Sequence, residues 1–255
     1  MRFHEATDIA SVICGYNGQA LMSVNPRNYA DSRDVPKYTL QQVAWYLDIP
    51  IATLRWWCLG RDFKIGGKPR HSDALITPAL YNANSPSLSF YNLAEIHILV
   101  ATRRFHKISM PKIRDAIDYL EGPSKGQVKH PLLSQEFFTD GKGLFVKHLL
   151  ETVNLGKKGQ LAFKELVDQH LERIVPDATG RPEKLYPVRH GDLANKSVII
   201  IPTVGSGHPV TTRKGIRVSA LWNRKQAGES LTEIADDYGL TQIEVEEAIR
   251  YVEAA

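Results

Sequence analysis

The spacing of hydrophobic residues predicts two short helices joined by a tight turn. From Leu40 to Leu47, apolar residues recur at the i, i+3, i+4 and i+7 positions that share one helix face. Thr39 and Gln42 can exchange hydrogen bonds at the start of this helix in a capping box. Pro50 disfavours helical geometry at the preceding residue, so we expect a second helix over 51–59. This pattern is that of a helix-turn-helix.

The pattern changes over 61–90, where glycines, prolines and short β-prone pieces predict a hairpin, or wing. Two more helices should follow. The first is expected over 92–106, with Asn92 and Glu95 as its capping box, and the second over 109–122. The predicted order is helix, turn, helix, wing, helix, helix.

The rest of the chain gives weaker signals until the C-terminal helices. We expect a strand at 144–146, an amphipathic helix over 161–174 and a polar linker over 177–184. A short buried strand at 197–201 should precede three helices, which begin near residues 218, 231 and 241. The last two helices form a second helix-turn-helix unit.

The predicted fold class is mainly α, with a winged helix-turn-helix, a helical middle segment with short strands and a small C-terminal helix-turn-helix domain. The expected boundaries are 1–36 for an irregular N-terminal arm, 37–122 for the winged unit, 123–184 for the middle segment and linker, and 185–255 for the C-terminal domain.

Composition places the protein among soluble globular chains. Its 255 residues, 43% hydrophobic and 24% charged, suffice for one large domain or a few small ones. No apolar run approaches a membrane span and no signal peptide is recognisable, so we expect a cytoplasmic location and no contact with membranes. Cys14 and Cys58 are too few for a disulfide framework and are expected to be thiols.

Charge is distributed unevenly, although the net charge is only +4. Residues 37–120 contain eleven Lys or Arg against six Asp or Glu, whereas residues 226–255 contain eight acids and one arginine. We therefore expect a polyanion as the partner of the front of the chain and a protein or a basic surface as the partner of its end. Solvated surface is the alternative interpretation.

The helix over 51–59 is the candidate reading helix for DNA. Its outward positions can enter a major groove, and basic residues in the wing can contact phosphates. The DNA-binding residues expected from the sequence are Tyr38, Thr53, Arg55, Arg61, Lys64, Lys68 and Arg70.

The last helix has the opposite chemistry. Carboxylates near phosphates would be repelled, so this helix should meet a protein surface and not a DNA groove. A solvated bundle with acids near a helix N-terminus is the alternative. The expected partner-binding residues are Glu244, Glu246, Glu247 and Arg250.

Catalytic signatures are missing from the sequence. The nine histidines are scattered, and Gly205-Ser206-Gly207 lacks the flanks of a nucleophile elbow or a phosphate loop. We expect no enzyme activity, no catalytic or metal-binding residues and no cofactor.

Two parts of the chain resemble known families. The first helix-turn-helix and the helices after the wing resemble the winged helix-turn-helix of the MerR family. The stretches that carry this likeness are 38–44, 53–57, 90–96 and 109–114.

Residues 207–210 and 228–251, with Gly228-Glu229-Ser230 and Gly239-Leu240-Thr241 among them, resemble a bacterial domain family of VapB-type antitoxins. The two likenesses in this order are similar to large VapB-type antitoxins encoded beside a toxin with a PIN-like ribonuclease fold. The resemblance implies that the protein neutralises such a toxin and represses its own operon by binding operator DNA.

Operators of this kind are usually inverted repeats, so we also expect a homodimer. Acidic side chains at the C-terminal end could mimic RNA toward the toxin. Two alternatives stay open: a MerR-like transcription regulator without a toxin partner, and an adaptor in which neither helix-turn-helix contacts DNA.

Overall fold

The structure is a computed structural model that describes residues 29–82, 85–104, 108–122, 128–134, 141–152 and 157–253. Most of the predicted arm, Cys14 and the predicted helix end at 105–106 lie outside these ranges. The described part of the arm, 29–36, contains the short 3-10 helix η2 (Ser32–Asp34), which is held in place by side-chain contacts. Arg33 in η2 forms ion pairs with Asp31, at 2.7 Å, and with Asp177, at 2.6 Å.

The predicted helix-turn-helix is confirmed as α2 (Leu40–Tyr46) and α3 (Ile51–Leu59). The capping box of Thr39 and Gln42 is present at the start of α2. Strand β1 (Tyr38–Thr39) pairs with β4 (Ser87–Leu88), so the two ends of the wing region are joined. This pairing fixes where the wing leaves and re-enters the unit.

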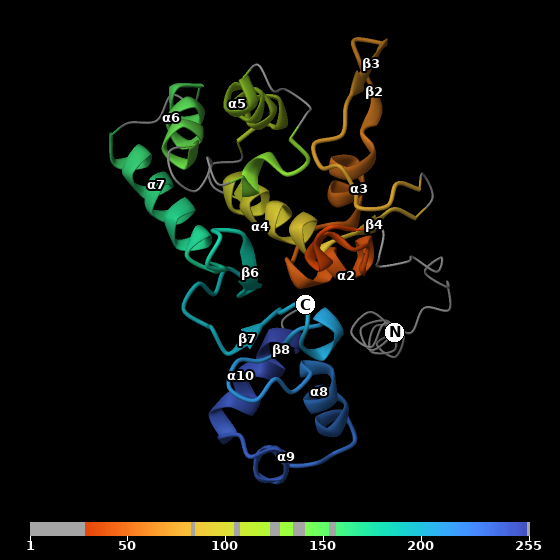
Figure 1. Ribbon diagram of the computed structural model, residues 1–255, viewed down its shortest axis with the longest axis vertical. Helices are drawn as coiled ribbons and strands as arrows, with labels where there is room; N and C mark the ends of the chain where they lie inside the picture. Colours follow the sequence, from red (N-terminus) through yellow and green to blue (C-terminus); the bar gives the residue numbers. More distant parts are fainter. Residues whose placement is uncertain are drawn as a thin grey trace.

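The wing is an antiparallel hairpin of β2 (Arg61–Ile65) and β3 (Lys68–Ser72). Gly66 and Gly67 form its two-residue turn with φ of +56° and +77°, which suits the twist of such hairpins. Figure 1 shows this hairpin extending at one end of the molecule, away from the C-terminal helices.

Helix α4 (Phe90–Arg104) begins earlier than the sequence predicts. At its start, each of Ser89 and Asn92 donates its backbone N–H to the side chain of the other, at 3.1 Å. This reciprocal pair replaces the capping box that the sequence predicts for Asn92 and Glu95. The Glu95 carboxylate is instead buried and lies 2.7 Å from His130 Nδ1. The predicted capping box was therefore wrong by one turn.

The strand predicted at 144–146 is wrong, because these residues belong to helix α6 (Lys142–Thr152). Phe145 and Leu149, four positions apart, are both fully buried, and α6 packs against α5 (Met110–Glu121). A short apolar run does not distinguish a strand from a buried helix segment. The amphipathic helix is present as α7 (Lys157–Leu171), which packs against α4.

The predicted linker over 177–184 is also wrong. Strand β6 (Pro182–Leu185) pairs with β5 (Ile174–Pro176) to form a second hairpin. The Asp177 carboxylate accepts hydrogen bonds from the backbone N–H groups of Thr179 and Arg181 and so organises the turn. The polar composition of this segment predicts a linker, but the Asp177 side chain stabilises the turn of a hairpin instead.

The C-terminal end consists of a small two-stranded sheet and three helices, in the predicted order. Figure 1 shows these helices grouped at the end of the molecule opposite the wing. The elements are β7 (Val198–Ile199), β8 (Val210–Thr211), α8 (Val218–Gln226), α9 (Leu231–Tyr238) and α10 (Gln242–Glu253).

Buried hydrophobic residues form two cores. The first runs from Tyr38 to Ile200 and includes α2, α3 and α4 together with α6 and α7. The second runs from Val198 to Val252 and is built by the C-terminal helices. The side chain of Trp45 packs against both cores, so α2 lies where they meet.

Candidate nucleic-acid interface

Helix α3 presents a continuous exposed face, which we call the reading face: Ile51, Ala52, Arg55 and Trp56. Leu54 and Trp57 point into the first core, as the helical period requires. The Trp56 ring is 44% exposed, and the Arg55 side chain is exposed as expected.

Tyr38 is not available to DNA, which corrects the sequence-based assignment. Its side chain is fully buried, and its hydroxyl donates a 3.0 Å hydrogen bond to the carbonyl oxygen of Gly207. Burial raises the pKa of this phenol well above its usual value. Thr53 is partly buried and faces the hollow beside α3, whereas Arg55 faces outward.

A stack of side chains joins the reading helix to the wing. The Arg61 guanidinium lies 4.3 Å from the centroid of the Trp56 ring and 5.3 Å from that of Phe63. Cation–π contacts of this kind favour a fixed orientation of both partners. Trp56 and Phe63 were missed by sequence reasoning, because the stack depends on how the hairpin folds back toward α3.

The cations of the wing are exposed, as predicted. Lys64, Lys68 and Arg70 all lie at the surface of the hairpin. The negative charge of Asp62 is paired with His71, whose Nδ1 lies 2.7 Å from the carboxylate, and this contact raises the pKa of the imidazole. The hairpin therefore presents a strongly positive surface.

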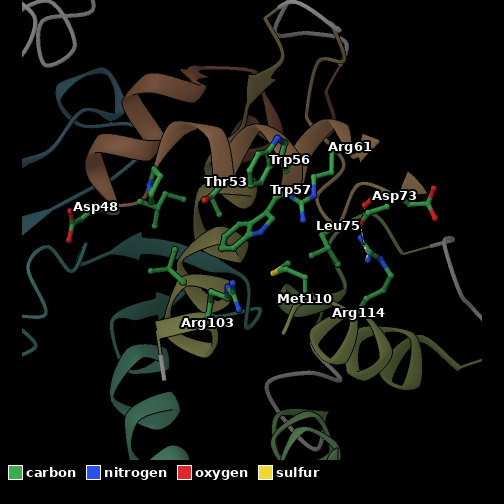
Figure 2. Close-up of a pocket in the computed structure, with 14 residues that line it drawn as sticks. Asp48, Thr53, Trp56, Trp57, Arg61, Asp73, Leu75, Arg103, Met110 and Arg114 are labelled. Carbon is green, nitrogen blue, oxygen red and sulfur yellow. Dashed lines mark hydrogen bonds between the residues drawn. The ribbon is translucent and has the colours of Figure 1, made fainter. Parts of the chain in front are cut away.

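A hollow of about 330 Å³ lies between α3, the wing exit and the junction of α4 and α5 (Figure 2). Arg103 and Arg114 point toward it, but both also hold the local structure. The Arg114 guanidinium donates to the carbonyl oxygen of Asp73, and that of Arg103 donates to the carbonyl oxygen of Ile108. The Arg114 contact fixes the base of the wing relative to α5, and the Arg103 contact ties α4 to the residues before α5.

The wing is further anchored to the end of α3. The backbone N–H groups of Leu75 and Ile76 donate to the carbonyl oxygen of Trp57, at 2.7 and 3.0 Å. Gly60 has φ of +72°, and a Cβ atom there would lie 2.7 Å from the carbonyl oxygen of Ser72. The hairpin is thus attached at its base and projects from a rigid support.

The carboxylates of α10 are placed differently from the sequence-based expectation. Glu244 accepts two hydrogen bonds from Arg213, at 2.7 and 2.8 Å, and caps the helix through Thr241. Glu247 accepts a hydrogen bond from the hydroxyl of Ser197. Only Glu246 remains as an exposed carboxylate of the predicted set, 3.2 Å from Arg250 one turn later.

The acidic character of this end is also smaller than the last thirty residues suggest. Residues 185–255 contain eight Lys or Arg and nine Asp or Glu, so basic residues earlier in the domain offset the acids of the last helices. Arg224 pairs with Glu229 and Asp237, as Arg213 does with Glu244. The domain is nearly neutral, and its acids serve largely to hold it together.

An interface, which we call the seam, joins α2 to the C-terminal core. The Arg189 guanidinium lies 4.1 Å from the ring centroid of Trp45 and donates to the carbonyl oxygen of Tyr251. The Tyr251 hydroxyl donates to the carbonyl oxygen of Tyr46, at 3.1 Å. The Tyr46 hydroxyl lies 2.7 Å from Nδ1 of His208. The seam therefore ties the helix-turn-helix to the C-terminal helices.

Neither a metal site nor a membrane span is found in the part of the chain that the structure describes. No three His, Cys, Asp or Glu side chains gather there in a way that could hold a metal ion. Among the same residues, no helix is both long and apolar enough to cross a bilayer. Cys58 is a buried thiol, as expected, and burial raises its pKa to about 12.

Two family models match parts of the chain. Residues 36–117 match a family described as "Putative DNA-binding HTH domain". Residues 198–252 match a family described as "Protein of unknown function (DUF433)". The first match covers the helix-turn-helix and the wing, and the second covers the C-terminal core.

The chain is also similar to proteins of Mycobacterium tuberculosis. It is 29% identical over 235 residues to "Putative antitoxin VapB45", across 87% of this chain and 95% of the relative. The X-ray crystal structure of Rv2018 from the same organism matches with a TM-score of 0.60 and 27% identity, covering 84% of this chain and 98% of that chain. The chain is thus homologous to an antitoxin relative and contains a helix-turn-helix of the DNA-binding type.

Proposed function

We propose that this protein is the cytoplasmic antitoxin of a type II toxin–antitoxin pair of the VapBC kind, which represses its own operon and neutralises a PIN-like ribonuclease. The observation that carries the proposal is the similarity to "Putative antitoxin VapB45" over 87% of this chain, joined to a helix-turn-helix with an exposed cationic wing. The protein acts by binding and not by catalysis.

The N-terminal unit serves as a MerR-like winged helix-turn-helix. Its reading face enters the major groove of operator DNA, where Arg55 reaches a base edge or a phosphate and Thr53 lies at the margin. The basic residues of the wing contact phosphates and supply a salt-dependent part of the affinity. The phosphate-contacting residues in this proposal are Arg61, Lys64, Lys68 and Arg70.

The proposal includes a homodimer on DNA. Operators of this kind are usually inverted repeats, and a two-fold pair of chains places one reading helix on each half-site. Sedimentation should then give a mass that corresponds to two protein chains bound to one operator duplex.

The toxin contact is assigned to the C-terminal domain. Because Glu244 and Glu247 are bound within their own fold, the exposed pair of Glu246 and Arg250 is the part of the predicted set that a toxin can meet. The proposal does not include mimicry of RNA by this domain, since its acidic side chains are largely paired with neighbouring arginine side chains.

The alternative is a MerR-like regulator without a toxin. The internal pairing of Arg213 with Glu244 and of Arg224 with Glu229 supports it, because acids that are paired within the domain are not available to a toxin. In that case the C-terminal domain serves only the assembly of the regulator.

Binding of the full chain to the DNA upstream of its gene tests the DNA-reading assignment. Arg55→Ala and Lys64→Ala should weaken binding, and the slope of log affinity against log salt should fall by about one for each lost phosphate contact. Lys158→Ala, at an exposed position of α7, is the matched control and should leave the slope unchanged. Equal slopes in all four proteins would contradict the assignment.

Co-expression with the product of the adjacent gene tests the toxin. The full chain should co-purify with that product and suppress its toxicity to growth, and Arg250→Glu should reduce the retained amount while Arg55→Ala should not. Unaltered DNA binding with no retained neighbour would favour the regulator without a toxin.

A further inference from the structure

The hollow beside α3 combines an apolar floor with a cationic rim (Figure 2). Trp57 and Val100 belong to the first core and are almost fully buried. Leu75 and Met110 pack against that core and complete the floor. The volume of about 330 Å³ lies within the range of small-molecule sites, which are mostly apolar with a few polar groups that orient the ligand. The hollow therefore has the size and lining of a site for a ligand of one or two rings.

Three guanidinium groups border this floor: Arg61, Arg103 and Arg114. The Arg114 guanidinium donates one N–H to the carbonyl oxygen of Asp73 and another, at 3.4 Å, to the hydroxyl of Ser72. A guanidinium has five N–H donors, so Arg114 keeps donors for a ligand. In the described part of the chain, Arg61 lies over two aromatic rings and forms no ion pair. The rim can therefore accept an anion.

The two carboxylates that border the hollow do not neutralise this rim. Figure 2 shows Asp48 and Asp73 at its margins. The Asp73 side chain is 87% exposed and lies 3.5 Å from Nε2 of His71. The Asp48 carboxylate accepts a hydrogen bond from the backbone N–H of His190. The charge of the rim is therefore positive, which favours a negatively charged ligand.

We propose that the hollow binds a small planar aromatic carboxylate. The ring lies on the apolar floor beside Trp57 and Met110, and a thioether contacts aromatic rings favourably. The carboxylate accepts paired hydrogen bonds from the Arg114 guanidinium, whose planar fork matches it. Arg114 is half-buried, and partial exclusion of water strengthens such a pair. The apolar floor favours this ligand over an inorganic anion, which would leave the floor exposed to water.

The hollow shares two residues with the stack that joins α3 to the wing. Trp56 and Arg61 line the hollow and also contact each other. A bound carboxylate therefore lies near a cation that the proposed function assigns to DNA phosphates, and it weakens the attraction between them. By linkage, bound DNA weakens the ligand by the same factor. This regulatory part rests on the proposed DNA-binding function, whereas the ligand site itself does not.

Calorimetry of the full chain with naphthoate tests the site, and naphthamide is the uncharged probe of similar shape. The carboxylate should bind about ten-fold more tightly than the amide, because only the carboxylate forms charged hydrogen bonds with arginine. In a proton–nitrogen correlation spectrum, the indole peak of Trp57 should shift, whereas that of Trp222, in the second core, should not. No heat and no shift at millimolar naphthoate, or equal affinities for the two probes, would overturn the proposal.

Two variants of the hollow test the assigned roles. Arg114→Gln removes the cation but keeps an amide that can donate to the Asp73 carbonyl oxygen, and its affinity for naphthoate should fall by about ten-fold. Met110→Trp fills the hollow without changing any charge and should abolish binding. Arg181→Gln, at an exposed arginine between β5 and β6, is the matched control and should bind as the wild type does. Thermal unfolding checks that the variants fold, and wild-type binding by either variant of the hollow would contradict the site.

Retardation of the upstream DNA with and without saturating naphthoate tests the coupling. The ligand should weaken DNA binding by about ten-fold and lower the slope of log affinity against log salt by about one. Bound ligand with unaltered DNA binding would overturn the coupling alone. A wild type that binds naphthoate but no upstream DNA would overturn the proposed function and leave the site standing. A lower salt slope in Arg114→Gln with unchanged naphthoate affinity would assign the rim to DNA phosphates and overturn the site.

Discussion

At the scale of single residues, the Tyr38 hydroxyl shows how the first core is attached to the loop before β8. It donates to the carbonyl oxygen of Gly207, which is itself buried. Tyr38→Phe should lower the free energy of unfolding by about 1 kcal/mol, because that oxygen would lose its donor. Urea unfolding measures this change, and Tyr81→Phe, at a 67% exposed tyrosine, should produce none.

The same variant tests whether Tyr38 contacts DNA. Tyr38→Phe should bind the upstream DNA fragment with the affinity of the wild type and with the same slope of log affinity against log salt, since the Tyr38 side chain is buried. A weakened complex with unchanged stability would restore the original assignment. The misassignment has a physical cause: local helical spacing places Tyr38 beside α2, but the partner of its hydroxyl is 169 positions away.

Residue-level prediction succeeded where the helical period alone decides orientation. Arg55 lies outward and Leu54 inward because α3 is a regular helix over one core. It did not reach Trp56, whose role depends on Arg61 returning from the wing. The sequence could therefore predict which face of α3 is exposed to solvent, but not which residue of the wing packs against that face.

At the scale of elements, the start of α10 shows a charge used for stability. The contact with Arg213 lowers the pKa of Glu244 to about 2, below its ordinary value of 4.5. A carboxyl whose pKa is lower in the folded chain than in the unfolded chain stabilises the folded state at any pH above the pKa of the unfolded chain. This contribution is lost as the pH falls toward the pKa of the folded chain. The pair therefore contributes at neutral pH and not in strong acid.

Glu244→Gln should reduce the free energy of unfolding at pH 7 by about 1 kcal/mol or less, since an exposed ion pair is screened by solvent. The glutamine oxygen can still cap Thr241, so the variant removes mainly the charge. The difference from the wild type should shrink as the pH falls from 5 to 3. Glu253→Gln, at the exposed end of α10, should show no such difference. A gap that stays constant to pH 3 would contradict the assigned role.

Prediction of elements followed local chemistry closely and failed where packing decided. The capping box at Thr39 was predicted correctly because both of its partners lie within one turn. The predicted capping box of Asn92 and Glu95 does not form. The Ser89 hydroxyl accepts the hydrogen bond from the backbone N–H of Asn92, and the Glu95 carboxylate contacts His130 instead. The sequence did not predict helix α6, because its short apolar run suits a strand or a helix equally and the packing against α5 decides between them.

At the scale of the whole molecule, the seam couples the two cores through α2. Its aromatic rings surround Arg189, a 5% exposed cation that contacts two rings and one carbonyl oxygen. A buried charge is costly unless it is well compensated, so this arrangement should form only when both cores are folded. The charge totals of chain segments could not predict it, because pairing joins Trp45 to residues more than 140 positions away.

His208 makes this coupling dependent on pH. Burial, together with the nearby charges of Arg217 and Lys37, lowers the pKa of its imidazole to about 4 from an ordinary 6.5. The unfolded chain therefore binds a proton at a higher pH than the folded chain, and stability is lost as the pH falls from 6.5 toward 4. In the folded chain the ring therefore stays neutral, with Nδ1 2.7 Å from the Tyr46 hydroxyl, until the pH falls to about 4.

We expect His208→Asn to remove this loss. Between pH 7 and pH 5 the wild type should lose about 1–2 kcal/mol of unfolding free energy that the variant retains, because asparagine does not titrate. Urea unfolding followed by tryptophan fluorescence is suited to the measurement, since Trp45 lies in the seam. The Glu95–His130 pair also titrates, but it is common to both proteins and cancels in the comparison. Parallel stability curves for the two proteins would show that His208 is protonated without cost and that the seam does not respond to pH.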